Sequence, residues 1–327
     1  MTDRPLLDVR ELVVTHRTAD LGRRRRVTAV DDVSFSVRRG ETLALVGESG
    51  AGKSTTARAI LRLVEPDAGA IAYDGADLLA LRGEALRRHR RRMQVVFQDP
   101  YTSLNPRHTI AAIVGEGLIV HGLARGPDVA ARVARLLDEV GLPADVAGRY
   151  PRALSGGQRQ RVAIARALAV DPEFLVLDEA VSALDVTTQA QVLALIARLR
   201  DARRLTCLFI AHNLAVVQQV ATTVAVMYAG RILEVAPVAA LFESPLHPYT
   251  RALLDAVPVT DPRDRHKRAP VPAGTASVGP PARSGCPWAP RCTHPGKDAS
   301  CVSVRPSLAE SGRERSVACP KVVPPTL

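Results

Sequence analysis

Two short stretches of the sequence combine glycines with residues that bind phosphate. Positions 47–54 read Gly-Glu-Ser-Gly-Ala-Gly-Lys-Ser, and positions 154–158 read Leu-Ser-Gly-Gly-Gln. Glycine lets the backbone turn tightly and point its N–H groups at a phosphate. A helix that begins at such a turn adds the partial positive charge of its N-terminus. The first stretch therefore predicts a binding loop for nucleotide phosphates, and the second predicts another anion site at a second helix start.

The residues around the first stretch predict a strand before it and a helix after it. Positions 42–46 form a short apolar run typical of a buried parallel strand, and apolar residues over positions 60–64 recur at helical spacing. A phosphate-binding loop requires this context, whereas a Gly-rich turn without a ligand does not. In it, Lys53 reaches the β- and γ-phosphates and the Ser54 hydroxyl binds Mg²⁺. The predicted nucleotide contacts are Gly47, Glu48, Ser49, Gly50, Ala51, Gly52, Lys53, Ser54 and Thr55.

Two carboxylates follow a second apolar run at positions 174–177. Asp178 and Glu179 come directly after it, and the carboxyl end of a parallel strand lies beside the phosphate crevice. We expect Asp178 to hold Mg²⁺ through water and Glu179 to polarise the attacking water. Phosphoryl transfer needs mainly positioning and charge neutralisation, so these groups suffice with one lysine. The plainer alternative is a capping pair at a strand end.

The second glycine-rich stretch begins a predicted helix over positions 159–168. Ser155 is a suitable N-cap, and apolar residues follow on one face. One bound nucleotide does not need two helix N-termini of this kind from one compact domain. We therefore expect this stretch to reach the γ-phosphate of a nucleotide held by a second subunit, so that the dimer closes on ATP and opens after hydrolysis. The predicted contacts in trans are Ser155, Gly156, Gly157 and Gln158.

Together these motifs resemble the ATP-binding subunits of ABC transporters, along almost the whole chain. The resemblance implies an ATPase with an α/β fold that uses ATP and Mg²⁺. It implies that Gln98 is the Q-loop glutamine, which senses the metal and the water and connects to the membrane partner. It places Asp185 in the D-loop at the dimer seam, and it makes His212 the switch histidine near the γ-phosphate. Without the resemblance, a histidine after an apolar strand is more often structural.

Three positions depart from the pattern of that family. Ala180 follows the predicted catalytic glutamate, where the family usually has proline. Asn213 follows the switch histidine in place of aspartate, and it can still cap the next helix. His16 occupies the position at which the family usually stacks an aromatic residue on adenine. None of these changes removes a phosphate or metal contact, so we expect an active ATPase.

The chain continues beyond the end of a minimal transporter ATPase, near position 235. Positions 244–254 resemble the start of the C-terminal extension of oligopeptide/dipeptide importer ATPases and their nickel-importing relatives, and positions 97–107 and 210–217 favour the same subgroup. The resemblance is strongest to the second of the paired ATPase subunits. It implies an energy-coupling subunit on the cytoplasmic face of the membrane, with a second ATPase subunit, two permease subunits and an extracytoplasmic substrate-binding protein as partners. It leaves the cargo open between peptides, nickel and other solutes.

A soluble ABC-type ATPase acting on nucleic acid or ribosomes is the alternative. Arg-rich runs at positions 23–26 and 87–92, within a net charge of +11, could touch nucleic acid or anionic lipid. Such proteins usually carry two ATPase halves, a long coiled coil or zinc modules, which this sequence lacks. We therefore expect no nucleic-acid partner, and we interpret the basic runs as a solvated hairpin tip and an exposed helix face.

Four of the five cysteines lie in the extension. These are Cys286, Cys292, Cys301 and Cys319, with five, eight and seventeen residues between successive cysteines. This spacing lacks the closely spaced cysteine pairs of a zinc ribbon. Four thiolates can hold a [4Fe–4S] cluster, and some relatives carry one. Such a cluster would cross-link a tail too short for a large core. Zinc and unligated thiols remain alternatives, whereas Cys207, in an apolar run, is predicted to be a core residue.

These patterns predict an α/β P-loop NTPase with a RecA-like core over positions 42–97 and about 170–230. Alternation at positions 33–37 and the run at 12–14 predict an N-terminal antiparallel β subdomain. A helical subdomain is inserted at about 99–168. The ATP-binding domain spans 1–235 and the extension 236–327, with a linker at 258–283.

Three smaller expectations complete this picture. A core helix is predicted from apolar spacing at 192–199. Positions 205–230 carry no charge and are long enough to span a bilayer, but polar residues within them favour strand, helix and strand. The start of the chain has no apolar segment typical of a signal peptide.

Overall fold

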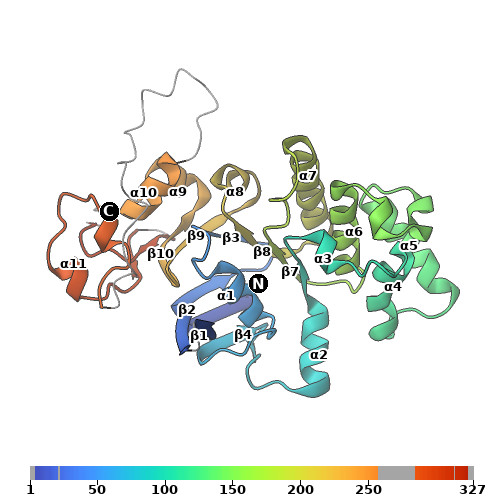
Figure 1. Ribbon diagram of the computed structural model, residues 1–327, viewed down its shortest axis with the longest axis horizontal. Helices are drawn as coiled ribbons and strands as arrows, with labels where there is room; N and C mark the ends of the chain where they lie inside the picture. Colours follow the sequence, from blue (N-terminus) through green and yellow to red (C-terminus); the bar gives the residue numbers. More distant parts are fainter. Residues whose placement is uncertain (1–3, 21–22, 257–283, 313, 323–327) are drawn as a thin grey trace.

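The computed structural model describes residues 4–20, 23–256, 284–312 and 314–322. The predicted linker at 258–283 lies outside the described residues. The described chain builds two sheets (Figure 1). The four-stranded sheet lies beside the middle of the eight-stranded one, while a group of helices and the C-terminal extension lie at opposite ends.

The larger sheet has a parallel centre. β3 (Thr42–Val46) pairs with β8 (Thr206–Ala211) and with β9 (Thr223–Tyr228). β7 (Phe174–Asp178) pairs with β8 and with β6 (Met93–Val96). Every residue of β3, β7 and β8 is buried, because helices cover both faces of a parallel sheet. The apolar runs therefore predicted these strands correctly.

The other end of this sheet is antiparallel and includes the extension. β10 (Arg231–Pro237) pairs with β9, and β12 (Ser316–Val317) pairs with β10 and with β11 (Ala309–Glu310). The strand order is β11-β12-β10-β9-β3-β8-β7-β6. Strands from the end of the chain thus continue the sheet that carries the phosphate loop.

The smaller sheet confirms the predicted N-terminal antiparallel subdomain. β1 (Leu7–Asp20) pairs with β2 (Arg23–Val37) and with β4 (Ala68–Tyr73), which pairs with β5 (Ala76–Asp77). The assignment of all of 42–97 to the parallel core is wrong for β4 and β5. The physical reason is that β1 offers β4 an antiparallel edge, against which Ile71 is fully buried.

Three of the described helices pack against one another. α4, α5 and α6 form the group at one end of the molecule (Figure 1), and α4 contacts both of the others. Apolar residues of α7 at the predicted 192–199 positions are buried, which confirms a core helix. The helices are α1 (Lys53–Ile60), α2 (Gly83–Arg92), α3 (Pro100–Ser103), α4 (Ile110–Val120), α5 (Pro127–Glu139), α6 (Gly156–Leu168), α7 (Val186–Arg203), α8 (Leu214–Val220), α9 (Val238–Glu243), α10 (Pro248–Asp255) and α11 (Ser300–Ser303), with short 3₁₀ turns at Ala144–Gly148, Pro151–Ala153 and Ala289–Arg291.

The uncharged stretch 205–230 folds as β8, α8 and β9, as predicted. None of the helices in the described part of the chain combines the length and the apolar character needed to cross a membrane. The basic run on α2 lies at the surface as expected, and some of its arginines also contact neighbouring segments. Arg90 and Arg91 donate hydrogen bonds to backbone carbonyls of Leu61 and Val170, so they hold the helix against the core.

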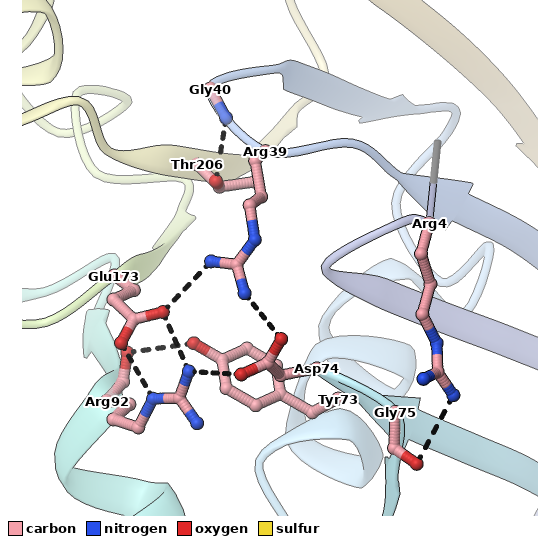
Figure 2. A network of polar contacts seen from close by, with 9 residues as sticks. All are labelled: Arg4, Arg39, Gly40, Tyr73, Asp74, Gly75, Arg92, Glu173 and Thr206. Carbon is pink, nitrogen blue, oxygen red and sulfur yellow. Dashed lines mark hydrogen bonds and ion pairs between the residues drawn. The ribbon is translucent and has the colours of Figure 1, made fainter. Parts of the chain in front are cut away.

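A ring of four alternating charges joins the two sheets (Figure 2). The Arg92 guanidinium lies 2.8 Å from the Glu173 carboxylate and 2.7 Å from that of Asp74. Arg39 pairs with the same two carboxylates. Asp74 follows β4 of the smaller sheet and Glu173 precedes β7 of the larger one. The ring therefore lies at the end of β7 opposite to Asp178.

Protonation of this ring should destabilise the fold. The hydrogen bonds from Arg92 lower the pKa values of Glu173 and Asp74 below their ordinary values of 4.5 and 3.8. Carboxylates with lowered pKa values contribute stability above those ordinary values, and the contribution is lost as pH falls. We expect Glu173→Gln to cost about 1 kcal/mol of unfolding free energy at pH 7, since the ring is partly exposed.

Urea denaturation at several pH values checks this expectation. The cost of Glu173→Gln should shrink toward pH 3 and in 1 M salt, while Glu310→Gln on exposed β11 should cost little at any pH. An equal cost at pH 7 and pH 3 would contradict the electrostatic role of the ring.

Candidate active site

The loop between β3 and α1 can be built only from glycine at two positions. Gly52 has a φ of +103°, and a Cβ there would lie 2.2 Å from the carbonyl oxygen of Ala29. At Gly47 a Cβ would lie 2.0 Å from the carbonyl oxygen of Met227. β2 and the end of β9 therefore enclose the loop closely. The glycines predicted to bring the backbone onto phosphates are the ones that this packing demands.

Lys53 lies along the inside of the loop. Its side chain is buried, and its ammonium donates hydrogen bonds to the carbonyl oxygens of Gly47 at 2.8 Å and Glu48 at 2.9 Å. Burial lowers the pKa of Lys53, while the carboxylates of Glu179 and Asp178 act in the opposite direction. A cation held in this way faces the space enclosed by the loop.

The structure brings together two of the three predicted metal ligands, Ser54 and Asp178. The Ser54 hydroxyl donates a 2.7 Å hydrogen bond to the Asp178 carboxylate at the carboxyl end of β7. Burial raises the pKa of Asp178, and the Ser54 hydrogen bond opposes that rise. A hydroxyl and a carboxylate are oxygen ligands of the kind that Mg²⁺ binds, so these residues fit the ion.

Glu179 and His212 lie next to each other and both line a cavity of about 180 Å³. His212 Nδ1 lies 3.6 Å from Glu179 Oε2. Glu179 has a φ of +49°, and its N–H donates to the carbonyl oxygen of Ile210 in β8. This left-handed backbone is uncommon for a residue with a side chain, and such positions cluster at functional sites. Asn213 caps α8 through Ala215, as predicted.

Two other predicted residues, His16 and Gln98, lie at this edge, but only His16 contacts a residue of the phosphate-binding segment. His16 Nε2 lies 3.3 Å from the Thr55 hydroxyl, so β1 brings the predicted adenine-side residue to the start of α1. Gln98 follows β6 and is exposed at the same carboxyl edge of the sheet. The structure therefore places Gln98 on the same edge as Ser54 without joining the two residues.

The second glycine-rich stretch forms a capping box at the start of α6. Ser155 Oγ accepts from the Gln158 N–H at 3.2 Å, and Gln158 Oε1 accepts from the Ser155 N–H at 3.0 Å. Asp185 caps α7 through the Thr188 N–H, and this hydrogen bond lowers the pKa of Asp185. Both segments are described, and residues 154–158 make no hydrogen bond with the phosphate loop. The N-cap prediction is confirmed, and this end of α6 remains available for an external anion.

The extension cysteines lie around one small cavity. Cys286, Cys292, Cys301 and Cys319 line a space of about 20 Å³ with His247. Burial raises the pKa of Cys286 to about 11. In the described ranges, however, no group of three or more histidine, cysteine, aspartate or glutamate side chains is arranged to hold a single metal ion. Cys207 is buried in β8, where desolvation raises its pKa to about 12, which confirms the predicted core role.

Two residues at this site were missed by sequence reasoning. The Glu48 N–H donates to the Tyr249 hydroxyl at 3.1 Å, and Arg291 donates to the Glu48 carboxylate at 3.3 Å. Tyr249 lies in the run 244–254, which served only to indicate a subgroup. The contacts span 201 and 243 positions, so no local spacing could reveal them.

Comparisons with known proteins agree with this geometry. The family model described as "ABC transporter" matches residues 30–182, and the one described as "Oligopeptide/dipeptide transporter, C-terminal region" matches residues 233–301. A protein of Brucella ovis named as a peptide import ATP-binding protein is 46% identical over 319 residues, covering 98% of each chain. The oligopeptide transport ATP-binding protein OppF of Bacillus subtilis is 52% identical over 241 residues, covering 73% of this chain and 79% of that protein.

A solved structure is similar as well. An ATP-binding cassette determined as a dimer in a post-hydrolysis state, bound to ADP and Pi, superposes with a TM-score of 0.63 at 26% identity, covering 71% of this chain and 98% of that one. With the P-loop geometry described above, these likenesses establish an ABC ATPase fold. The chain belongs to the ABC transporter ATP-binding proteins that carry the oligopeptide/dipeptide transporter C-terminal region, and it is an ATPase of that family.

Proposed function

We propose that this chain is the energy-coupling ATPase subunit of an importer for peptides. One observation carries the proposal, namely the presence in one chain of a complete phosphate loop with its carboxylates and of the matched C-terminal region. The chain works as a dimer with a second ATPase subunit at the cytoplasmic face of two permease subunits, and an extracytoplasmic binding protein delivers the peptide. Relatives named for peptide import support the cargo class.

At the phosphate loop, each group has a defined task. Backbone N–H groups within residues 47–55 bind the phosphate oxygens, and Lys53 pairs with the β- and γ-phosphates. Ser54, Asp178 and Gln98 would hold Mg²⁺. When bound, the ion neutralises charge on the phosphate oxygens during phosphoryl transfer. His16 lies on the adenine side, next to Thr55.

Glu179 and His212 act on the water that attacks the γ-phosphate. The Glu179 carboxylate accepts a hydrogen bond from this water and orients it in line with the leaving group. His212, 3.6 Å from that carboxylate, is placed to hold both the glutamate and the γ-phosphate. The cavity that both residues line supplies room for the water beside them.

The second nucleotide contact comes from the other subunit. We infer that residues 155–158 and Asp185 of one subunit face the nucleotide on its partner. Gly156 supports this inference, because a Cβ there would meet only Leu184 Cδ2, at an ordinary 3.6 Å. Packing within the subunit therefore does not require glycine at this position, whereas close approach of a γ-phosphate does.

Gly156→Asp should separate folding from turnover. The fold accommodates the side chain, but its negative charge would repel the γ-phosphate in the closed dimer. We expect ATP hydrolysis to fall by about 100-fold or more, with ATP affinity and melting temperature near wild type. Steady-state ATPase assays and ATP titrations measure this, with Ala153→Asp near the exposed end of its short 3₁₀ turn as the control. Normal turnover by Gly156→Asp would argue against the in-trans contact.

We also propose that the four extension cysteines hold a structural [4Fe–4S] cluster. The gathering of all four thiols at one place in the extension supports this proposal, because a [4Fe–4S] cluster binds four thiolates. Anaerobically purified protein should contain about four iron and four sulfide per chain, and Cys301→Ser should lower both. A preparation with zinc alone, or without metal, would refute the cluster.

Reconstitution tests the importer function. The chain is combined with its permeases and second ATPase in vesicles, and ATPase activity is compared with and without peptide-loaded binding protein. We expect stimulation by the loaded binding protein and no stimulation by DNA or RNA. Stimulation by nucleic acid alone would overturn the proposal.

A further inference from the structure

The C-terminal extension contacts the phosphate loop at the peptide unit that orients its lysine. The carbonyl oxygen of Gly47 accepts from the Lys53 ammonium at 2.8 Å. The N–H of the same peptide unit, which belongs to Glu48, donates to the Tyr249 hydroxyl at 3.1 Å. The extension therefore binds the N–H of a peptide group whose carbonyl oxygen binds the Lys53 ammonium.

Tyr249 is itself fixed by buried contacts. Its ring is 1% exposed and packs at 4.7 Å from the Tyr228 ring and 4.9 Å from the Trp288 ring, measured between centroids. Its backbone N–H donates to His247 Nδ1 at 3.0 Å, and the His247 N–H donates to the fully buried Glu234 carboxylate in β10 at 2.8 Å. The hydroxyl thus occupies a position set by the main sheet.

A second contact from the extension concerns charge. The Arg291 guanidinium lies 4.2 Å from the centre of the Trp288 ring and donates to both oxygens of the Glu48 carboxylate. The Arg291 and Glu48 side chains are 20% and 44% exposed, so this ion pair adds little to stability. It does neutralise a carboxylate in the loop that must bind a polyanion.

We propose that Tyr249 and Arg291 are positioning residues for ATP binding. Tyr249 fixes the Gly47–Glu48 peptide group so that Lys53 is oriented before the nucleotide arrives. Arg291 offsets the negative charge of Glu48 next to the phosphates. The inference goes beyond the importer function and needs only ATP binding at the loop. If the loaded binding protein did not stimulate ATPase activity in vesicles, the importer proposal would fail while this inference would stand. The failure of one can therefore be distinguished from the failure of the other.

Equilibrium binding of ATP to the full chain without Mg²⁺ tests the role of Tyr249. Tyr249→Phe removes only the hydroxyl and keeps the ring packing, so we expect a Kd about three- to tenfold higher, the loss of one hydrogen bond. Tyr73→Phe is the matched control, because that buried hydroxyl makes one long contact, at 3.5 Å, far from the loop. A merely structural role would lower the melting temperature without moving Kd. Wild-type affinity in folded Tyr249→Phe would overturn the proposal.

A double-mutant cycle tests the role of Arg291. Arg291→Ala should raise the Kd for ATP about two- to fivefold, whereas Arg305→Ala, in the same extension but paired with Asp31, should leave it unchanged. In the Glu48→Gln background, Arg291→Ala should have no further effect, because the charge to be offset is gone. An equal loss in both backgrounds would show that Arg291 does not act through Glu48.

Discussion

Glu179→Gln should slow ATP hydrolysis by about 10²- to 10⁴-fold, the range expected when a positioned general base is removed. The amide keeps the size of the side chain but cannot accept a proton from the attacking water. ATP binding should persist, because Lys53 and the loop N–H groups are unchanged. The protein should therefore accumulate as an ATP-bound dimer, which size-exclusion chromatography with light scattering detects in parallel with the ATPase assay.

Glu243→Gln is the matched control for this experiment. It makes the same chemical change on the exposed surface of α9 and should leave turnover and oligomeric state unaltered. Hydrolysis at the normal rate by Glu179→Gln would remove Glu179 from the role of orienting water. The neighbouring His212 would then have to be tested for it, given its 3.6 Å separation.

Lys53→Ala should lower ATP affinity about 10- to 100-fold, which corresponds to the removal of a charge-assisted hydrogen bond. The ammonium is already directed along the loop by two carbonyl oxygens, so little reorganisation accompanies phosphate binding. Titration of the full chain with ATP measures the loss.

Lys297→Ala removes the same charge from an exposed position in the extension, and its ATP affinity should equal that of the wild type. If Lys53→Ala bound ATP as tightly as the wild type, the loop would hold the phosphates through its backbone alone. The role assigned to the lysine would then be wrong.

Local patterns predicted the parts of the site that depend on neighbouring residues. Apolar runs identified β3, β7 and β8, and the carboxyl ends of these strands gave the shared edge on which Glu179 and His212 meet. The N-cap at Ser155 was also predicted from the sequence, because its hydroxyl accepts from a backbone N–H only three residues away.

Contacts between distant segments could not be obtained in this way. The antiparallel pairing of β4 with β1 depends on an edge offered some sixty positions earlier, which a short alternating run does not reveal. The hydroxyl of Tyr249 reaches the loop only after the extension has folded back over β10. A single sequence carries the residues for such contacts but not their pairing.

The pairing of β12 with β10 near the end of the extension affects what happens when the protein is truncated. β12 pairs with β10 at Glu234 and Val235, and the Ala318 N–H donates to the carbonyl oxygen of Leu233. A truncation after Pro237 would remove β12 and leave the backbone N–H and C=O groups on that edge of β10 unpaired. An unpaired strand edge of this kind can pair with strands from other molecules. Such a shortened cassette should therefore precipitate or form open-ended assemblies, even with every phosphate-binding residue still in place.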